Sequence, residues 1–485
     1  MTAASEHTDV LIVGAGLSGI GLTWHLQQGQ PHRSYAILEA RAASGGTWDL
    51  FRYPGVRSDS DLATFAYGFR PWTGEQAIAD GAAVLDYIRA TAAQHGIDRR
   101  IRFGHKVVRA AWSSATARWT VDVELAGTGE RIAMTCDWLV AATGYYRYDE
   151  GYTPRFPDAG DFGGRIVHPQ AWPEDLEVAG KRIVVIGSGA TAVTLVPALA
   201  ARGARVTMLQ RSPSYVMPVP RHDAVADRLR AWFGPARGHR LTRRKNIWQQ
   251  RAVYRLCRRH PAAARRVIRR INARMLPAHV DVDTHFSPRY DPWDERLCVV
   301  PKGDLFRAFH DRSAEIVTDG VDRFTARGLR LNSGRELEAD IVVTATGLNL
   351  LVLGGIALEV DGDPVTISDT TAYRSMMLSG VPNLAFAVGY TNASWTLKVD
   401  LVGRRLVDLL RHMRQHGFQQ VVAVVDDATM ERRPLLDISA GYVLRALPAL
   451  PRQGTRDPWR VVMDYREDVR QLRRAPVADP ALRFA

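Results

Sequence analysis

Cysteine is scarce in this chain. Its three cysteines, Cys136, Cys257 and Cys298, lie far apart in the sequence. An odd number of widely spaced cysteines argues against a disulfide framework and against a Cys-x-x-Cys metal or redox pair. We therefore expect neither a bound metal nor disulfide reduction by two neighbouring thiols.

Long apolar runs are also missing. No stretch approaches the roughly 18 to 20 uncharged apolar residues that cross a bilayer. The first residues, MTAASEHTDV, show neither a basic region nor an apolar region of the kind found in signal peptides. We therefore expect a cytoplasmic protein. With 485 residues, of which 46% are hydrophobic and 24% charged, the chain has enough material for two or more domains.

Acidic residues are absent from one segment. Between Arg240 and Arg274 there are thirteen Lys or Arg, in a chain whose formal charge is 64 − 51 = +13. Apolar residues are interleaved with these cations as on amphipathic helices, which is compatible with an anionic membrane surface or with a solvated face near a phosphorylated cofactor. No nucleic-acid motif accompanies the charge, so we expect no nucleic acid partner. Peripheral membrane association and the oligomeric state stay open.

The segment DVLIVGAGLSGIGLTWHLQ is typical of a dinucleotide-binding unit. A buried strand turns through Gly14, Gly16 and Gly19 into a helix. These glycines permit the tight turn, the approach of a pyrophosphate and the packing of helix on strand. Glu39 ends the next strand, where a carboxylate can accept hydrogen bonds from a ribose diol. The alternative, an ordinary strand-turn-helix, does not account for this acid.

The pattern recurs at KRIVVIGSGATAVTLVPALA. The loop and helix start comprise Gly187, Ser188, Gly189, Ala190, Thr191 and Ala192, with alanine in the place of the third glycine. Arg211 and Ser212 follow the next strand, where an NAD site would have an acid. An arginine and a hydroxyl can bind a ribose 2′-phosphate, which predicts an NADPH site. The competing interpretation is a surface arginine after a strand.

Two dinucleotide loops in one chain indicate a flavin reduced by a nicotinamide. We predict an α/β fold with two Rossmann-like domains, in which the NADP domain is inserted within the FAD domain. The FAD-binding domain would comprise residues 1–145 and 345–485, and a linker would span 146–179. The NADP-binding domain would span 180–344 and carry the basic helical insertion. Alternating residues between 106 and 140 predict a small antiparallel layer.

The stretch FGGRIVHPQAWP, residues 162–173, fits neither a regular helix nor a strand. Taken alone, it is a linker with an ordinary histidine. It matches F-x-G-x-x-x-H-x-x-x-W-P, a motif of type I Baeyer–Villiger monooxygenases, through Phe162, Gly164, His168, Trp172 and Pro173. A second pattern of that family, G-G-x-W-x-x-x-x-Y-P-G-x-x-x-D, is matched by Gly45, Gly46, Trp48, Tyr53, Pro54, Gly55 and Asp59. The chain resembles this family over essentially its whole length.

The resemblance implies an enzyme that uses FAD, NADPH and O2 to insert one oxygen atom beside a ketone carbonyl, giving an ester or lactone. Sulfides and thioamides are further substrates that it implies. His168 would belong to a hinge between domains and would not donate a proton to substrate. The alternatives are an N- or S-oxygenating flavin monooxygenase on the same fold, and a basic membrane-surface protein that retains the fold without the activity.

The resemblance also implies site residues. The family's active-site arginine aligns with Arg296, and Asp59 with the carboxylate that orients it; by itself Arg296 could be a surface arginine. Glu295 stands where several members have a lysine for the NADP 2′-phosphate, which leaves more of that task to Arg211. FAD would be lined by Ser18, Glu39, Thr47, Trp48, Asp59 and Val107. NADP would be lined by Arg57, Ser58, Gly187, Ser188, Gly189, Thr191, Arg211 and Ser212. The segments 213–223 and 348–356, which no motif describes, would shape the substrate pocket.

Overall fold

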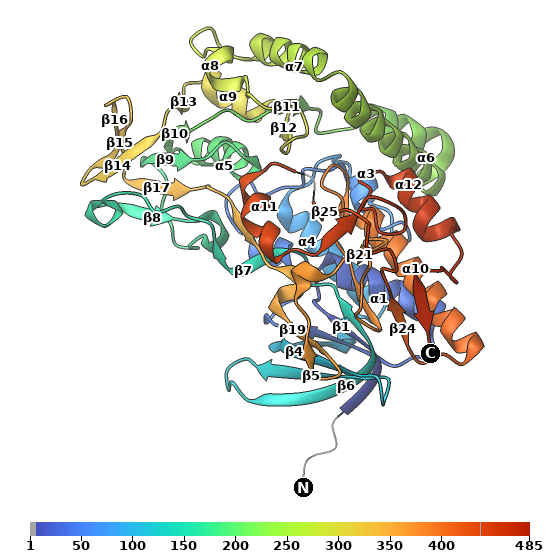
Figure 1. Cartoon of the computed structure of the whole chain (residues 1–485). Helices are drawn as coiled ribbons and strands as arrows, with labels where there is room; N and C mark the ends of the chain where they lie inside the picture. Colours follow the sequence, from blue (N-terminus) through green and yellow to red (C-terminus); the bar gives the residue numbers. More distant parts are fainter. Residues whose placement is uncertain (1–5, 437) are drawn as a thin grey trace.

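Two β-sheets organise the chain. The structure is a computed structural model that describes residues 6–436 and 438–485. Figure 1 shows the first sheet in the lower part of the molecule, the second sheet at the upper left, and the helices α6 and α7 over the top. The first sheet has nine strands, in the order β20-β19-β4-β5-β6-β1-β2-β3 with β23 paired to β6, and the second has five, in the order β13-β10-β9-β17-β8.

The first sheet contains the expected dinucleotide-binding unit. Its parallel part is formed by β1 (Glu6–Val13), β2 (Tyr35–Glu39), β3 (Ile101–Phe103), β6 (Arg131–Ala141) and β23 (Leu384–Phe386). The run from Val10 to Val13 is buried on both faces, as its continuous apolar sequence requires. The helices α1 (Leu17–Gly29) and α10 (Trp395–His416) pack against each other, so the C-terminal part of the chain completes this domain.

The antiparallel strands expected between residues 106 and 140 are present. They are β4 (His105–Ser113), β5 (Arg118–Leu125) and β6. They do not form a separate layer, because β6 pairs with β5 on one edge and with β1 on the other. The edge of the sheet is then extended by β19 (Ala357–Val360) and β20 (Asp363–Pro364).

The second sheet is entirely parallel. Its strands are β8 (Arg165–Val167), β9 (Arg182–Ile186), β10 (Arg205–Gln210), β13 (Ala314–Thr318) and β17 (Ile341–Thr344). The helices α5 (Ala190–Ala200) and α9 (Asp304–His310) contact each other beside this sheet. The strand β8 comes from the segment 146–179, so that segment contributes to the second sheet and is not only a connection.

The helix α6 (Ala224–Arg259) folds back on itself. Gly234 has φ 75° and interrupts the helical backbone between Ala224 and Arg259. The ammonium of Lys245 lies 2.5 Å from the Asp223 carboxylate, so the two arms run side by side. The second arm packs on α3 (Leu62–Phe65), and Arg243 donates hydrogen bonds to backbone carbonyl oxygens of that region. The amphipathic helix α7 (Pro261–Met275) follows.

The remaining elements connect and cover the two sheets. The remaining α-helices are α2 (Thr47–Leu50), α4 (Gly81–Gln94), α8 (Val282–Phe286), α11 (Gly441–Ala446) and α12 (Tyr465–Asp468). The remaining strands are β7 (Tyr146–Gly151), β11 (Val216–Val219), β12 (Cys298–Pro301), β14 (Val321–Thr325), β15 (Gly328–Leu331), β16 (Glu336–Glu338), β18 (Leu348–Leu350), β21 (Ala372–Tyr373), β22 (Met377–Leu378), β24 (Val421–Ala423), β25 (Arg432–Pro434), β26 (Arg452–Gly454) and β27 (Leu482–Phe484).

Among the described residues, none of the helices combines the length and the apolar composition that a membrane crossing requires.

Candidate active site

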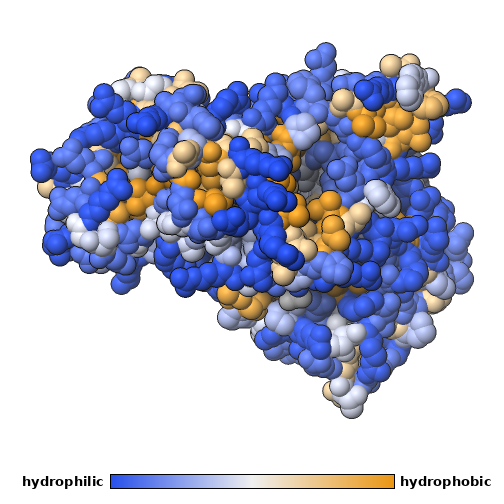
Figure 2. Space-filling model, turned by 90° about the horizontal axis from the view of Figure 1, so that it is seen from above, coloured by the Kyte–Doolittle hydropathy of each residue, from blue (hydrophilic) through white to orange (hydrophobic). Residues whose placement is uncertain are grey.

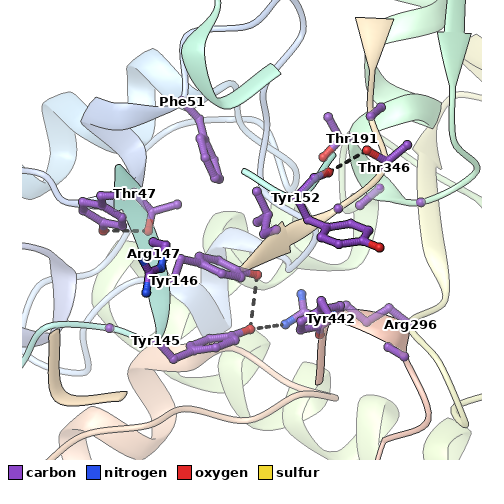
Figure 3. Close-up of a pocket in the computed structure, with 18 of the residues that line it drawn as sticks. Thr47, Phe51, Tyr145, Tyr146, Arg147, Tyr152, Thr191, Arg296, Thr346 and Tyr442 are labelled. Carbon is purple, nitrogen blue, oxygen red and sulfur yellow. Dashed lines mark hydrogen bonds between the residues drawn. The ribbon is translucent and has the colours of Figure 1, made fainter. Parts of the chain in front are cut away.

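A cavity of about 1750 Å³ lies where the two domains meet. Both glycine loops line it, and so do residues of the segments 213–223 and 348–356, which the sequence left without a motif. Figure 3 shows side chains from three distant parts of the chain, around positions 47, 145 and 296, in this one cavity. The arrangement fits two nucleotides that approach each other at a shared reaction centre.

The first glycine loop has the conformation of a phosphate cradle. Gly14 has φ 106°, and a Cβ there would lie 2.7 Å from the Ala142 carbonyl oxygen. A Cβ on Gly19 would overlap the Gly14 carbonyl oxygen, so the third glycine is required for helix packing. The loop passes at Gly16 into the N-terminus of α1, whose unpaired N–H groups favour an anion.

Glu39 lies at the end of β2, beside this cradle. Its carboxylate accepts hydrogen bonds from the backbone N–H groups of Ala15, at 2.8 Å, and Arg41, at 3.0 Å. These bonds fix the side chain, and a carboxylate has further lone pairs for a ribose diol. Glu39 lines the cavity, as do the expected flavin-site residues Ser18, Thr47, Trp48, Asp59 and Val107.

The second glycine loop repeats this geometry at the end of β9. Gly187 has φ 143°, and a Cβ there would overlap the Ala345 carbonyl oxygen, whereas a Cβ on Gly189 would meet nothing within 4 Å. The hydroxyl of Ser188 donates a 3.0 Å hydrogen bond to the Ser212 carbonyl oxygen, which joins this loop to the end of β10. The expected NADP-site residues Arg57, Ser58, Gly187, Ser188, Gly189, Ala190, Thr191, Arg211 and Ser212 all line the cavity.

Arg211 is exposed at the mouth of this second cradle. In the part of the chain that the structure describes, it makes no ion pair. Glu295 lies near it: burial raises the pKa of the Glu295 carboxyl, and the Arg211 charge opposes that rise. Arg211 therefore has its guanidinium available for an anionic group, and Glu295 is its electrostatic neighbour.

Arg296 places a cation deep in the cavity. Its Nη2 donates a 2.9 Å hydrogen bond to the Tyr145 hydroxyl, while its buried Nε has no hydrogen-bond partner among the described residues. Electrostatic interaction with Tyr145, and then with Tyr442, raises the pKa of Arg296 well above its usual value. Burial raises the pKa of Tyr442 to about 12, so this phenol stays neutral at physiological pH. Figure 3 shows Tyr145, Tyr442 and Arg296 grouped on one side of the cavity.

Asp59 shares this cavity with Arg296, but no ion pair joins the two side chains among the described residues. Burial within the protein raises the pKa of the Asp59 carboxyl, and the nearby Arg296 and Arg57 oppose that rise. The Asp59 side chain is exposed and lines the cavity. Arg57 is instead paired with the Asp304 carboxylate. Arg296 is therefore the less neutralised of these two arginines.

The sequence analysis did not identify the tyrosine cluster around Arg296. The Tyr145 ring stacks on Trp395, with centroids 5.1 Å apart and planes at 7°, and Trp395 donates a 2.8 Å hydrogen bond to the Ser18 hydroxyl. Tyr145 follows the strand-ending sequence AATG directly, which is a position where functional side chains gather in α/β folds and was the available signal. Tyr442 stands in no motif.

The motif 162–173 lies outside the cavity lining. Phe162 is buried against Phe324, with ring centroids 5.8 Å apart. A Cβ on Gly164 would overlap the Asp340 carbonyl oxygen, which explains the glycine. Trp172 packs on the core of the second domain and is followed by Pro173. The motif therefore belongs to the connection between the two sheets.

His168 ties this motif to the segment that returns to the first domain. Its Nδ1 accepts a 3.1 Å hydrogen bond from the Gln170 N–H, and its Nε2 lies 3.1 Å from the Gly347 carbonyl oxygen. An Nδ1 acceptor and an Nε2 donor define a neutral ring. Burial lowers the pKa of His168, and the backbone carbonyl oxygens oppose this effect. His168 does not line the cavity, and its role in a hinge stays a prediction.

Comparisons with known proteins agree with this arrangement. Residues 8–231 match the family described as pyridine nucleotide-disulphide oxidoreductases. The chain is 55% identical to the FAD-containing monooxygenase EthA of Mycobacterium tuberculosis over 99% of this chain and 98% of that protein. It is 48% identical to the FAD-containing monooxygenase EthA of Mycolicibacterium smegmatis over 99% of this chain and 97% of that protein.

Solved structures show the same fold at low identity. An oxidized steroid monooxygenase bound to NADP superposes with a TM-score of 0.75 at 20% identity, over 99% of each chain. A cyclohexanone monooxygenase in an open crystal structure superposes with a TM-score of 0.71 at 20% identity, over 87% of this chain and 90% of that one. The expected α/β class with two dinucleotide-binding units is confirmed.

We predict that His168→Gln lowers the free energy of unfolding by about 1 to 3 kcal/mol at neutral pH, since it leaves buried polar groups without partners. Because the folded-state pKa of His168 lies below its unfolded value, its contribution is complete above about pH 6.5 and is lost as pH falls toward the folded pKa. Thermal unfolding of wild type and variant should therefore differ most above neutral pH and converge on acidification. The control is His222→Gln, at an exposed position. A difference that grows on acidification would contradict the assigned neutral ring.

Proposed function

The chain belongs to the family of FAD-containing monooxygenases, and from this premise we propose that it is an NADPH-dependent Baeyer–Villiger monooxygenase. In the proposed reaction a ketone, O2, NADPH and a proton give an ester or lactone, NADP⁺ and water. One oxygen atom of O2 enters beside the carbonyl, and the other leaves as water. Sulfides and thioamides are further proposed substrates. The observation that carries this proposal is the half-buried guanidinium of Arg296 in the cavity that both nucleotide cradles line.

The residues of the first cradle fit FAD. The backbone at Gly14 and Gly16 leaves room for a pyrophosphate, since side chains there would narrow the loop. The Glu39 carboxylate can accept hydrogen bonds from the hydroxyl groups of the adenosine ribose, and Trp48 and Val107 form apolar parts of the cavity wall. When bound, FAD supplies the transfer of electrons from NADPH to O2. The protein supplies orientation, charge and shelter from water.

The residues of the second cradle fit NADPH. Gly189 leaves open space at the N-terminus of α5, where a pyrophosphate is favoured. Arg211 can bind the ribose 2′-phosphate with a charge-assisted hydrogen bond, because no carboxylate of the described residues neutralises it by direct contact. Glu295 is the unfavourable neighbour for this phosphate, so the preference for NADPH over NADH depends mainly on Arg211.

Arg296 would stabilise negative charge that develops on the substrate oxygen. A planar guanidinium can donate to two acceptors at once, which suits a carbonyl oxygen and a second anionic oxygen. The Tyr145 hydroxyl holds one nitrogen, and the tyrosine and tryptophan rings around it keep water away. Asp59 would orient the guanidinium across the cavity by its charge, because it makes no direct ion pair.

A panel of ketones and sulfides with NADPH tests this proposal. Products would be identified by mass spectrometry, with FAD-loaded wild-type protein. Ester or lactone formed from a ketone is the expected result, and sulfoxide formed from a sulfide is expected beside it. The alternative of an N- or S-oxygenating flavin monooxygenase predicts heteroatom oxidation without any ester. A protein that retains no flavin and oxidises no NADPH would overturn both.

We predict that Arg211→Ala lowers kcat/KM for NADPH roughly 10- to 100-fold while bound FAD is unchanged. The substitution removes one charge-assisted contact worth about 1.5 to 3 kcal/mol. The value for NADH should change little, because NADH has no 2′-phosphate. Steady-state kinetics with both coenzymes measures this, and Arg202→Ala, another exposed arginine of the same domain, is the control. Equal losses for both coenzymes would mean that Arg211 does not bind the 2′-phosphate.

Replacing Arg296 is predicted to separate NADPH oxidation from oxygen insertion. In Arg296→Ala and Arg296→Lys, ester formation should fall on the order of 100- to 1000-fold, since one preorganised charge contact is worth about 2.7 to 4 kcal/mol in a transition state. FAD should remain bound, because its cradle is intact. Electrons from NADPH should then leave as hydrogen peroxide.

The decisive quantity is ester formed per NADPH consumed, measured together with hydrogen peroxide. Arg289→Ala, an exposed arginine close in sequence, serves as the matched control and should retain wild-type coupling. Wild-type coupling in Arg296→Ala would assign the catalytic cation to another residue, with Arg57 the next candidate.

A further inference from the structure

The outer surface of α6 and α7 exposes large apolar side chains. Trp232 is 74% exposed and Trp248 66%, and they are accompanied by Phe233, Leu256 and Val267. Figure 2 views the molecule from the side on which Figure 1 places these helices, and it shows hydrophobic groups set among hydrophilic ones on this face. Single exposed apolar residues are ordinary, but several large ones on two adjacent helices indicate an interaction surface.

Two of these aromatic side chains lie at the tip of the α6 hairpin. The chain reverses at Gly234, directly after Trp232 and Phe233. A Cβ on Gly238 would lie 2.6 Å from the Arg230 Cα, so the two arms touch beside the reversal. The tip therefore presents two aromatic rings where the two arms of the hairpin pack closely.

The second arm carries an apolar stripe flanked by cations. Trp248, Ala252 and Leu256 follow one another at four-residue intervals, which places them on one face of the helix. Arg244 and Arg259 lie at the two ends of the same face, both exposed. An apolar stripe with arginine at its borders matches the interface of a bilayer, where rings enter the acyl boundary and guanidinium groups reach the headgroups.

The thirteen cations of residues 240–274 comprise two groups of six and Arg243, which donates hydrogen bonds to backbone carbonyl oxygens. Six are held in ion pairs with acids from elsewhere in the chain, namely Lys245, Arg251, Arg255, Arg258, Arg265 and Arg269. Within the described residues, six others make no ion pair, namely Arg240, Arg244, Arg259, Arg266, Arg270 and Arg274. Arg266, Arg270 and Arg274 repeat at four-residue intervals and form one row along α7. This second group supplies the net positive charge of the surface.

We propose that this α6–α7 surface, defined by Trp232, Phe233, Trp248, Leu256, Val267 and the six unpaired arginines, docks the protein peripherally on an anionic lipid bilayer. The unpaired arginines supply charge complementarity to the lipid phosphates, and the exposed rings supply apolar burial. A purely solvated face would need the charge but not the exposed tryptophans. The positive charge would also attract nucleic acid. Nucleic acid, however, has no apolar interior in which the aliphatic side chains of this surface could be buried.

The segment around α3 lies between the second arm of α6 and the cavity. Arg243 of the second arm donates hydrogen bonds of 3.0, 3.0 and 2.7 Å to the carbonyl oxygens of Ala63, Thr64 and Ala66. Phe65, on the same turn, lines the cavity. Membrane docking would therefore hold the cavity wall beside the bilayer, which suits apolar substrates. The docking proposal itself does not depend on the proposed reaction.

Sedimentation with vesicles tests the proposal on the full-length, FAD-loaded protein. The vesicles are pure phosphatidylcholine, and phosphatidylcholine with phosphatidylglycerol. Wild type should sediment with the anionic vesicles at low salt, stay in solution with the neutral ones, and be released as salt rises. The triple variant Arg244→Gln, Arg259→Gln, Arg270→Gln should partition on the order of 100-fold less, from a several-fold loss for each cation near the surface. The control triple variant Arg99→Gln, Arg202→Gln, Arg312→Gln removes three exposed arginines elsewhere and should behave as wild type.

A second variant tests the contribution of the exposed tryptophans apart from that of the arginine charges. Trp232→Ser with Trp248→Ser should weaken sedimentation at every salt concentration and leave bound flavin unchanged, with Phe103→Ser, another exposed apolar position, as its control. Binding indifferent to lipid charge and salt would overturn the proposal, as would wild-type binding by either α6–α7 variant. Dimers that form in solution and are lost in the tryptophan variant would assign the surface to a second copy of the chain instead.

Discussion

A guanidinium held by neutral hydroxyl groups is the interaction on which the candidate site depends. Arg296 donates to Tyr145 and lies against Tyr442, and neither phenol cancels its charge at physiological pH. A carboxylate in direct contact would have neutralised the cation, as Asp304 does for Arg57. Keeping Asp59 in the same cavity but outside ion-pair distance leaves positive potential where a substrate oxygen would stand. The stacked Trp395 ring fixes Tyr145, and so it fixes the cation indirectly.

The two glycine loops open toward the cavity that contains the Arg296 guanidinium. Each loop follows a parallel strand, and its backbone lies so close to the carbonyl oxygen of the residue after a neighbouring strand that a side chain cannot fit at Gly14 or Gly187. The loops therefore open toward one cavity, with His168 linking the segments that join the domains. His168 is neutral in these contacts, so the link places no charge in the interior.

The sequence predicted the parts of the fold that local sterics and periodicity determine. The strands around Gly14 and Gly187, the alternating strands near residue 120 and the amphipathic basic helices all have a short-range signature. The tyrosine cluster had none, because Tyr145 and Tyr442 approach Arg296 only through tertiary packing. The reversal of α6 at Gly234 was not predicted, and the acids that pair with Arg251, Arg255 and Arg258 of its second arm come from distant segments. Motif resemblance located Arg296, and only the structure shows what holds it.

We propose that an oxygen atom from O2 is inserted beside a ketone carbonyl in the cavity that Arg296 lines. The most direct test of this insertion is a turnover of wild-type protein with FAD, NADPH and a ketone under ¹⁸O-labelled O2, with mass spectrometry of the product. The expected product is an ester or lactone that carries one labelled oxygen atom, in the position between the carbonyl carbon and the migrated carbon. An ester labelled only when the water is labelled, or NADPH consumed with the ketone recovered unchanged, would contradict the proposal.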